Sequence, residues 1–138
     1  MNNIKSRAGG IILFILSLAL TVGIKLIFPA CGPHDDGSFM NCHWAEQAVF
    51  GSGIALTTVS LIVLIFGSSK VSLGASLAMI PTAAVTALIP DVFIPLCRMP
   101  MMRCHTIMHP AVIVISCLIA VTALVNAAVI IRKKERSK

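Results

Sequence analysis

Side chains that bind soft metals or exchange disulfides are concentrated in two short segments of this 138-residue chain. The pattern Met-x-Cys-His occurs twice, at Met40, Cys42 and His43 and again at Met102, Cys104 and His105. Thioether, thiol and imidazole groups together suit Cu(I), and they also serve as axial ligands of haem. These six residues therefore form one candidate binding site for copper or haem.

A second interpretation assigns the thiols to disulfides. Cys31 and Cys97 precede the two patterns, so Cys31–Cys42 and Cys97–Cys104 are natural loop-closing pairs on an oxidising membrane face. Closing loops of this size stabilises a fold by roughly 3 kcal/mol in the chain-entropy model. The same four cysteines allow three pairings, and those that cross between the patterns would join the two halves of the chain.

A third interpretation is redox exchange. Cys42 and Cys104 lie near predicted helix N-termini, a position that lowers the pKa of a thiol. However, the chain contains no Cys-x-x-Cys motif, the usual mark of a disulfide oxidoreductase. All three interpretations stay open at the level of the sequence.

Apolar runs must position these residues. Hydrophobic residues make up 57% of the chain and charged residues 12%, with a mean hydropathy of +0.96, which excludes a soluble enzyme and a disordered chain. Runs long enough to cross about 30 Å of hydrocarbon as helices cover 8–28, 48–67, 71–90 and 111–131. We predict an all-α polytopic membrane protein, a single domain over 1–138, with outer loops at 29–47 and 91–110 and a basic tail at 132–138.

The basic residues predict the orientation. Eight of the eleven lysines and arginines fall on the side of the termini, which places both termini in the cytoplasm. Lys25 lies near the outer end of the first span and is expected to extend its amine outward. The tail lacks interleaved aromatic residues, so it indicates contact with lipid headgroups and no nucleic acid.

An internal repeat relates the two halves. Each half reads as a span, a cysteine, a loop, Met-x-Cys-His and a second span, and both halves begin on the cytoplasmic side. They are therefore predicted to be parallel two-helix repeats, related by an axis along the membrane normal. This symmetry would bring both Met-x-Cys-His patterns to the same outer rim.

Charged residues near this rim have two interpretations. Glu46 and Asp91 lie near the outer ends of spans, where a carboxylate is a functional candidate by default. Arg98 and Arg103 lie on the same side, so an outer salt-bridge network is the more ordinary role. The run 35–37, Asp-Asp-Gly, lacks the spacing of a calcium loop and is expected to form a turn.

Small residues predict helix packing. The pairs Gly51–Ala55 and Gly74–Ala78 have the small-xxx-small spacing that lets membrane helices approach closely. The third span is therefore expected at the centre of the bundle or against a partner. Hydrogen bonds between helices are expected from Asn126, Thr57, Thr58 and Thr86.

No phosphate-binding glycine loop and no Gly-x-Ser-x-Gly motif is present, which favours a non-catalytic protein. The spans, with Cys31-Gly32, Met40-x-Cys42-His43-Trp44, Cys97 and Met102-x-Cys104-His105, resemble small bacterial membrane proteins grouped as domain-of-unknown-function family 4418. The resemblance extends from the first span to the fourth. It implies the bacterial cytoplasmic membrane and an accessory role beside ABC-type efflux transporters, and it supplies no catalytic residue.

Our leading hypothesis is thus a non-catalytic accessory subunit with an outer Cys/His/Met rim, in contact with the lipid bilayer and with ABC transporter subunits or further copies of itself. The alternatives are a binding or transport component for copper or haem, and a membrane thiol–disulfide oxidoreductase.

Overall fold

The structure, a computed structural model, describes residues 2–27, 29, 35–38, 41–96, 98–99, 101 and 103–137, with side chains from residue 8 onward. Its elements are α1 (Asn2–Leu26), α2 (Asn41–Phe66), α3 (Ser69–Leu88), the π-helical turn η1 (Cys104–Met108) and α4 (His109–Arg136). Four helical stretches are long and apolar enough to cross a membrane. No strand occurs among the described residues beyond one isolated bridge between Pro90 and Ile94. The prediction of an all-α, four-span membrane protein is confirmed.

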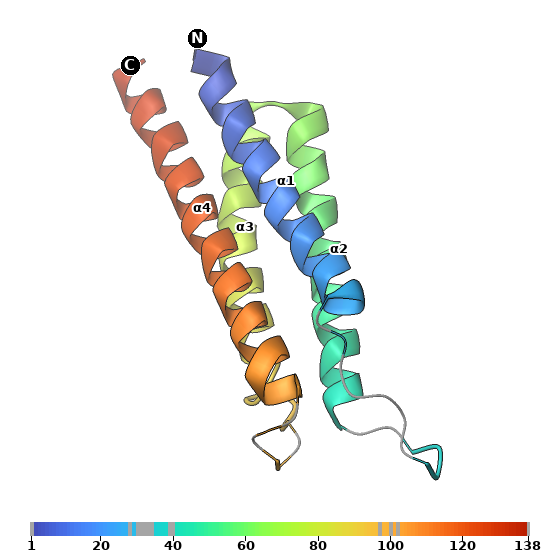
Figure 1. The fold of residues 1–138 in the computed structure, drawn as a ribbon. Coiled ribbons are helices and arrows are strands. Elements are labelled where there is room, and N and C mark those ends of the chain that lie inside the picture. The colour runs from blue at the N-terminus through green and yellow to red at the C-terminus, as the bar shows by residue number, and fades with distance from the viewer. Residues whose placement is uncertain are drawn as a thin grey trace.

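The helices run side by side in one elongated bundle (Figure 1). The start of α1, the end of α4 and the connection between α2 and α3 lie at one end, which we call the termini end. The opposite end, where α1 and α3 finish and α2 and η1 begin, is called the loop end. Packing is most extensive between α1 and α2 and between α3 and α4. The membrane side of each end, and the relation of the halves as repeats, stay predictions.

Helix boundaries differ from the predicted spans at the loop end. α2 begins at Asn41, so much of the predicted loop 29–47 is helical, and η1 with α4 covers the end of the predicted loop 91–110. The reason is the buried face of α2, because Cys42, Ala45 and Val49 follow helical spacing and all have no exposed surface. At the termini end α4 continues to Arg136, so most of the basic tail is helical as well.

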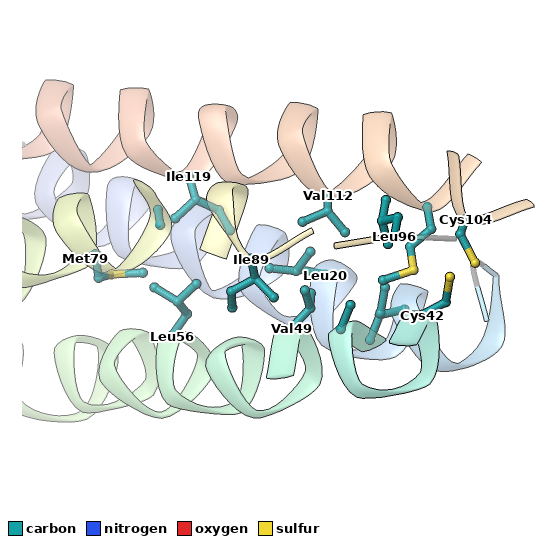
Figure 2. Packing of buried hydrophobic residues seen from close by; sticks show 14 of the residues in the cluster. Leu20, Cys42, Val49, Leu56, Met79, Ile89, Leu96, Cys104, Val112 and Ile119 are labelled. Carbon is teal, nitrogen blue, oxygen red and sulfur yellow. The ribbon is translucent and has the colours of Figure 1, made fainter. Parts of the chain in front are cut away.

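Buried apolar side chains form one cluster along the bundle axis, including Leu20, Leu56, Met79 and Ile119 (Figure 2). Many large apolar side chains remain on the outside, for example Ile65 and Val121. In a soluble protein such a surface would be a liability, whereas in a bilayer it faces hydrocarbon. The outer surface of the helices therefore fits the membrane assignment as well as their length does.

Glycines allow the helices to pack closely, but not the glycines that the sequence pattern selected. A Cβ on Gly53 would lie 2.7 Å from Oγ1 and 3.3 Å from Cα of Thr21, so α1 and α2 touch there. Gly9 likewise packs against Asn126. By contrast, Gly51 and Gly74 have nothing within 4 Å of a Cβ position, and both face the outside. The small-residue pair of α3 therefore faces outward and does not pack inside the bundle, so of the two expectations for this span, contact with a partner stays a prediction.

Hydrogen bonds between helices also differ in part from expectation. Asn126 Nδ2 donates to Ser76 Oγ at 2.9 Å and approaches Ser72 Oγ at 3.5 Å, which links α4 to α3. Thr57 Oγ1 lies 3.1 Å from Oγ1 of Thr21, linking α2 to α1. Two other residues expected to bond between helices donate instead to carbonyls of their own helix: Thr58 to Ile54 and Thr86 to Thr82.

A matched pair of substitutions tests the close packing. Gly53→Ala is expected to lower the free energy of unfolding in detergent by about 1–3 kcal/mol, the usual cost of overpacking. The clash with Thr21 is difficult to relieve, because Thr21 Oγ1 is held by the Ser17 carbonyl and by Thr57. Gly51→Ala has open space, and it should be neutral or stabilise by up to about 1 kcal/mol through helix propensity. Equal effects of the two variants would contradict the packing described here.

Candidate functional site

The predicted rim residues that the structure describes gather at the loop end. Cys42 and His43 lie in the first turn of α2, and Cys104 and His105 begin η1. The described residues of both patterns are thus brought to the same end of the bundle, as the sequence predicted. Other members of the predicted set lie outside the described residues, namely Cys31, Met40, Cys97 and Met102.

Cys104 and His105 of the second pattern lie in a π turn with an identifiable cause. His109 N–H bonds the carbonyl of Cys104, five residues earlier, in place of the usual four. Pro110 follows directly, and it has no N–H to donate to the carbonyl of Thr106. The proline ring also crowds that carbonyl, so the turn before it widens. The proline thus produces a wide turn directly before the long helix α4, and Cys104 is the first residue of this turn.

Among the predicted site residues that the structure describes, Cys42 and Cys104 are the most buried, each with 0% of its surface exposed. They belong to the same buried cluster as Leu96 and Met108. Figure 2 shows their side chains at the loop end with the sulfur atoms turned toward one another. Cys117 in contrast faces the outside of α4. No disulfide joins any two of these three described cysteines.

The imidazoles lie nearer the surface. His43 meets the ring of Trp44 edge-on, with centroids 5.9 Å apart, and Trp44 is 60% exposed, as an interfacial anchor requires. His105 and His109 stand edge to face at 6.5 Å. Over the part of the chain that the structure describes, no three His, Cys, Asp or Glu side chains are grouped closely enough to hold a metal ion. Copper or haem ligation, which also uses Met40 and Met102, stays a prediction.

An ion pair that sequence reasoning missed connects α1 to α2. Lys25 Nζ lies 2.7 Å from Glu46 Oε1, and the same amine stands 5.1 Å from the centroid of the Phe50 ring. Only 8% of the Glu46 side chain is exposed, against 33% for Lys25. Lys25 therefore turns inward to a carboxylate instead of extending outward alone. Only their positions in the sequence could have indicated this pair, because both residues lie within two turns of the loop that joins α1 to α2.

The remaining rim charges are on the surface. Asp91, Arg98 and Arg103 are exposed, whereas the pair of Lys25 and Glu46 at the same end is partly buried. Asp91 has φ = 84°, in the left-handed region that aspartate tolerates better than most residues. The turn around it is closed by Phe93 N–H to Leu88 and Ile94 N–H to Ile89. Asp91 therefore has a structural role in this turn, and the wider charge network stays a prediction.

The acidic run before α2 forms a turn, as expected. Ser38 donates to Asp36 Oδ1 from its hydroxyl at 2.8 Å and from its N–H at 3.4 Å, and Gly37 has φ = 79°. Both hydrogen bonds hold the pKa of Asp36 below its ordinary value, and the bond from the Ser38 hydroxyl has the larger effect. This is the geometry of a turn supported by a side chain.

A double-mutant cycle tests the Lys25–Glu46 pair. Lys25→Met leaves a buried carboxylate without this cation, so the free energy of unfolding should fall by about 1–3 kcal/mol, less than for a fully buried pair because Lys25 is partly exposed. Glu46→Gln in the Lys25→Met background should recover part of the loss. Unfolding in detergent, followed by circular dichroism, measures the free energy of unfolding of the wild type, of Lys25→Met, of Glu46→Gln and of the double variant. Strictly additive effects would show that the two side chains do not interact.

Comparison with known proteins gives one match. The family model described as domain of unknown function DUF4418 matches residues 13–129, which include all four membrane-spanning helices at least in part. No curated protein and no solved structure matches the chain significantly.

Proposed function

The chain belongs to the DUF4418 family, and we propose that it is a non-catalytic subunit that docks onto another integral membrane protein through one outward face of α2 and α3. This proposal rests on small residues that face outward. Gly51 and Gly74 are surrounded by open space, and Ala55 and Ala78 line a shallow groove of about 60 Å³ between the two helices. We call these four residues the small-residue face.

The small-residue face has a physical meaning in a bilayer. Lipid tails are as apolar as leucine, so membrane helices associate where small side chains let their backbones come close. Within this chain, Gly9 and Gly53 serve that purpose. Gly51 and Gly74 make no such close contact within this chain, although a glycine makes a helix less stable than an alanine would. A helix of a partner protein would fill the groove and use these positions.

Pro81 supports the same face. It lies inside α3 at helical spacing from Gly74 and Ala78, and its side chain is exposed. Because proline has no N–H, Pro81 cannot close the helical hydrogen bond to the carbonyl of Leu77. A backbone carbonyl at membrane depth needs a donor, since lipid supplies none. A partner helix with a hydroxyl or amide side chain would supply one at this point.

The charge distribution supports an accessory role over independent transport. Lys25 and Glu46 lie at the loop end and pair with each other, and the middle of every span lacks formal charge. An ion path or proton relay ordinarily needs ionisable groups at that depth. The partner class follows from the family resemblance: we take it to be the membrane-spanning part of an ABC-type efflux transporter in the bacterial cytoplasmic membrane.

A size-matched pair of substitutions tests the docking. Ala78→Leu fills the groove, and Ala128→Leu adds the same bulk to an exposed position on α4. Expressed in the native membrane, the wild-type chain and Ala128→Leu should migrate in a complex much larger than the chain, and should co-purify a transporter subunit. Ala78→Leu should lose that complex while keeping its helical content.

Three results would count against this proposal. They are a wild-type chain that migrates alone, a complex that both variants retain equally, and a complex composed only of further copies of this chain.

A second candidate function rests on Cys42 and Cys104, whose sulfurs are turned toward one another in the buried cluster (Figure 2). The two thiols would form a disulfide by exchange with a partner's disulfide: one new S–S bond forms, the partner's S–S bond is reduced, and its two sulfurs take the two protons. The product would join the first turn of α2 to η1, directly before α4. Closing a chain segment of this length stabilises by about 4 kcal/mol in the chain-entropy model.

Peptide mapping tests this pairing against the two local pairings. The purified protein is treated with oxidised glutathione, alkylated and digested without reductant. We expect a cross-linked peptide that contains Cys42 and Cys104. Cys117, on the outside of α4, serves as the internal control and should be alkylated. Cross-links of Cys31 with Cys42 and of Cys97 with Cys104 would instead establish the local loop closures, and would eliminate the buried pair as the redox site.

A further inference from the structure

A basic cavity lies at the termini end, opposite the end that holds Cys42 and Cys104. It is an open cavity of about 300 Å³ between α3 and α4. Three lysines line it, Lys70 from the first turn of α3 and Lys133 and Lys134 from the last turns of α4. Its other lining residues are Ser69, Ser137, Leu73 and Ile130. From this arrangement we propose that the cavity binds the phosphate headgroup of an anionic phospholipid.

The cavity has the charge of an anion site. Each of its three lysines carries one positive charge, and none of the lining residues is acidic. Glu135 is close in sequence but does not line the cavity. On α4 it lies about 140° around the helix axis from Ile130, whereas Lys133 and Lys134 lie on either side of Ile130. Clusters of like charge that lack a compensating partner repel one another, and an anion held among them relieves that repulsion. Lysine binds phosphate as a flexible point charge.

The polar groups around the lysines suit phosphate oxygens. The hydroxyls of Ser69 and Ser137 can donate hydrogen bonds into the cavity from either helix. α3 also begins there: Ser68 accepts from Val71 N–H at the cap, and the N-terminus of this 20-residue helix adds a partial positive charge. The helix end is a supporting feature, because the cavity and the three lysines define the site.

The apolar floor distinguishes a lipid from a free anion. Ile130 is only 6% exposed, and Leu73 is half-buried beside it, so the wall toward the membrane-spanning part of the bundle is hydrocarbon. Both residues belong to helices that cross the bilayer, whereas the lysines lie at the ends of those helices. A phospholipid would place its phosphate among the lysines and its acyl chain against Ile130 and Leu73. Basic pockets between helices at this depth recognise lipid headgroups.

Native mass spectrometry of the full chain in detergent tests the site. Phosphatidylglycerol and phosphatidylcholine are titrated in parallel, and phosphatidylglycerol should bind in preference with a stoichiometry of one. Lys70→Gln/Lys133→Gln should weaken that binding roughly 25-fold, at about fivefold for each lysine near an anionic headgroup. The matched control is Arg132→Gln/Arg136→Gln, which removes two charges from the same helix end but none from the cavity. It should change the affinity by less than about threefold, because neither arginine lines the cavity.

Two outcomes would overturn the proposal. Equal weakening by both double variants would mean a diffuse attraction of the helix ends to anionic surfaces. Displacement of the lipid by inorganic phosphate or glycerol phosphate at comparable concentrations would assign the cavity to a soluble anion. Circular dichroism of each variant separates these results from loss of folding, and all four substituted residues are exposed, so the bundle should remain intact.

Discussion

Burying apolar side chains gives membrane helices little reason to associate, because the lipid outside is as apolar as the interior. The bundle must therefore be held by close backbone approach and by a few polar contacts, and the structure depends on where these occur. Gly53 against Thr21 brings α1 to α2, and Asn126 with Ser76 brings α4 to α3. The two best-packed helix pairs are the pairs that these contacts join.

The same constraint explains why the two ends differ chemically. At mid-depth the polar side chains are mainly hydroxyls and one amide. Among the described residues the buried ones make hydrogen bonds within the bundle, except Ser116, whose Oγ has no hydrogen-bond partner. Formal charge appears where water or headgroups are near. At the loop end Lys25 and Glu46 neutralise each other inside the bundle, whereas at the termini end three lysines surround a cavity with no acidic lining residue. One end therefore holds an ion pair inside the bundle, whereas the other offers a basic cavity to an external anion.

The sequence was a good guide to which segments cross the membrane and a weaker guide to which side of a helix faces inward. Hydropathy over about twenty residues is a property of one segment, so four spans could be predicted. The inward face depends on how two helices cross, and for this reason Gly51 and Gly74 were assigned to packing while Gly9 and Gly53 were missed. The start of α2 at Asn41 was missed because a polar residue such as Glu46 lowers hydropathy even when its partner allows burial.

Of the candidate site, the gathering of Cys42 and Cys104 at one end followed from counting spans, since alternate connections of a four-span chain lie on the same side. Their burial did not follow, because a cysteine in a predicted loop gives no indication that the loop is helical. Lys25 as the partner of Glu46 was also not predictable from composition, which offered Arg98 and Arg103 on the same side.

The wide turn before α4 also affects how chain length can vary. A π turn accommodates one residue more than an α-helical turn, so a helix can lose a single residue there and close into regular α-helix without shifting the residues after the turn. Deleting one residue from Cys104–Met108 would thus preserve the register of α4 with α3 while changing the direction in which Cys104 points. Elsewhere in a span, the same deletion would rotate every later side chain by about 100°. Differences in length between related chains should therefore be tolerated at this turn.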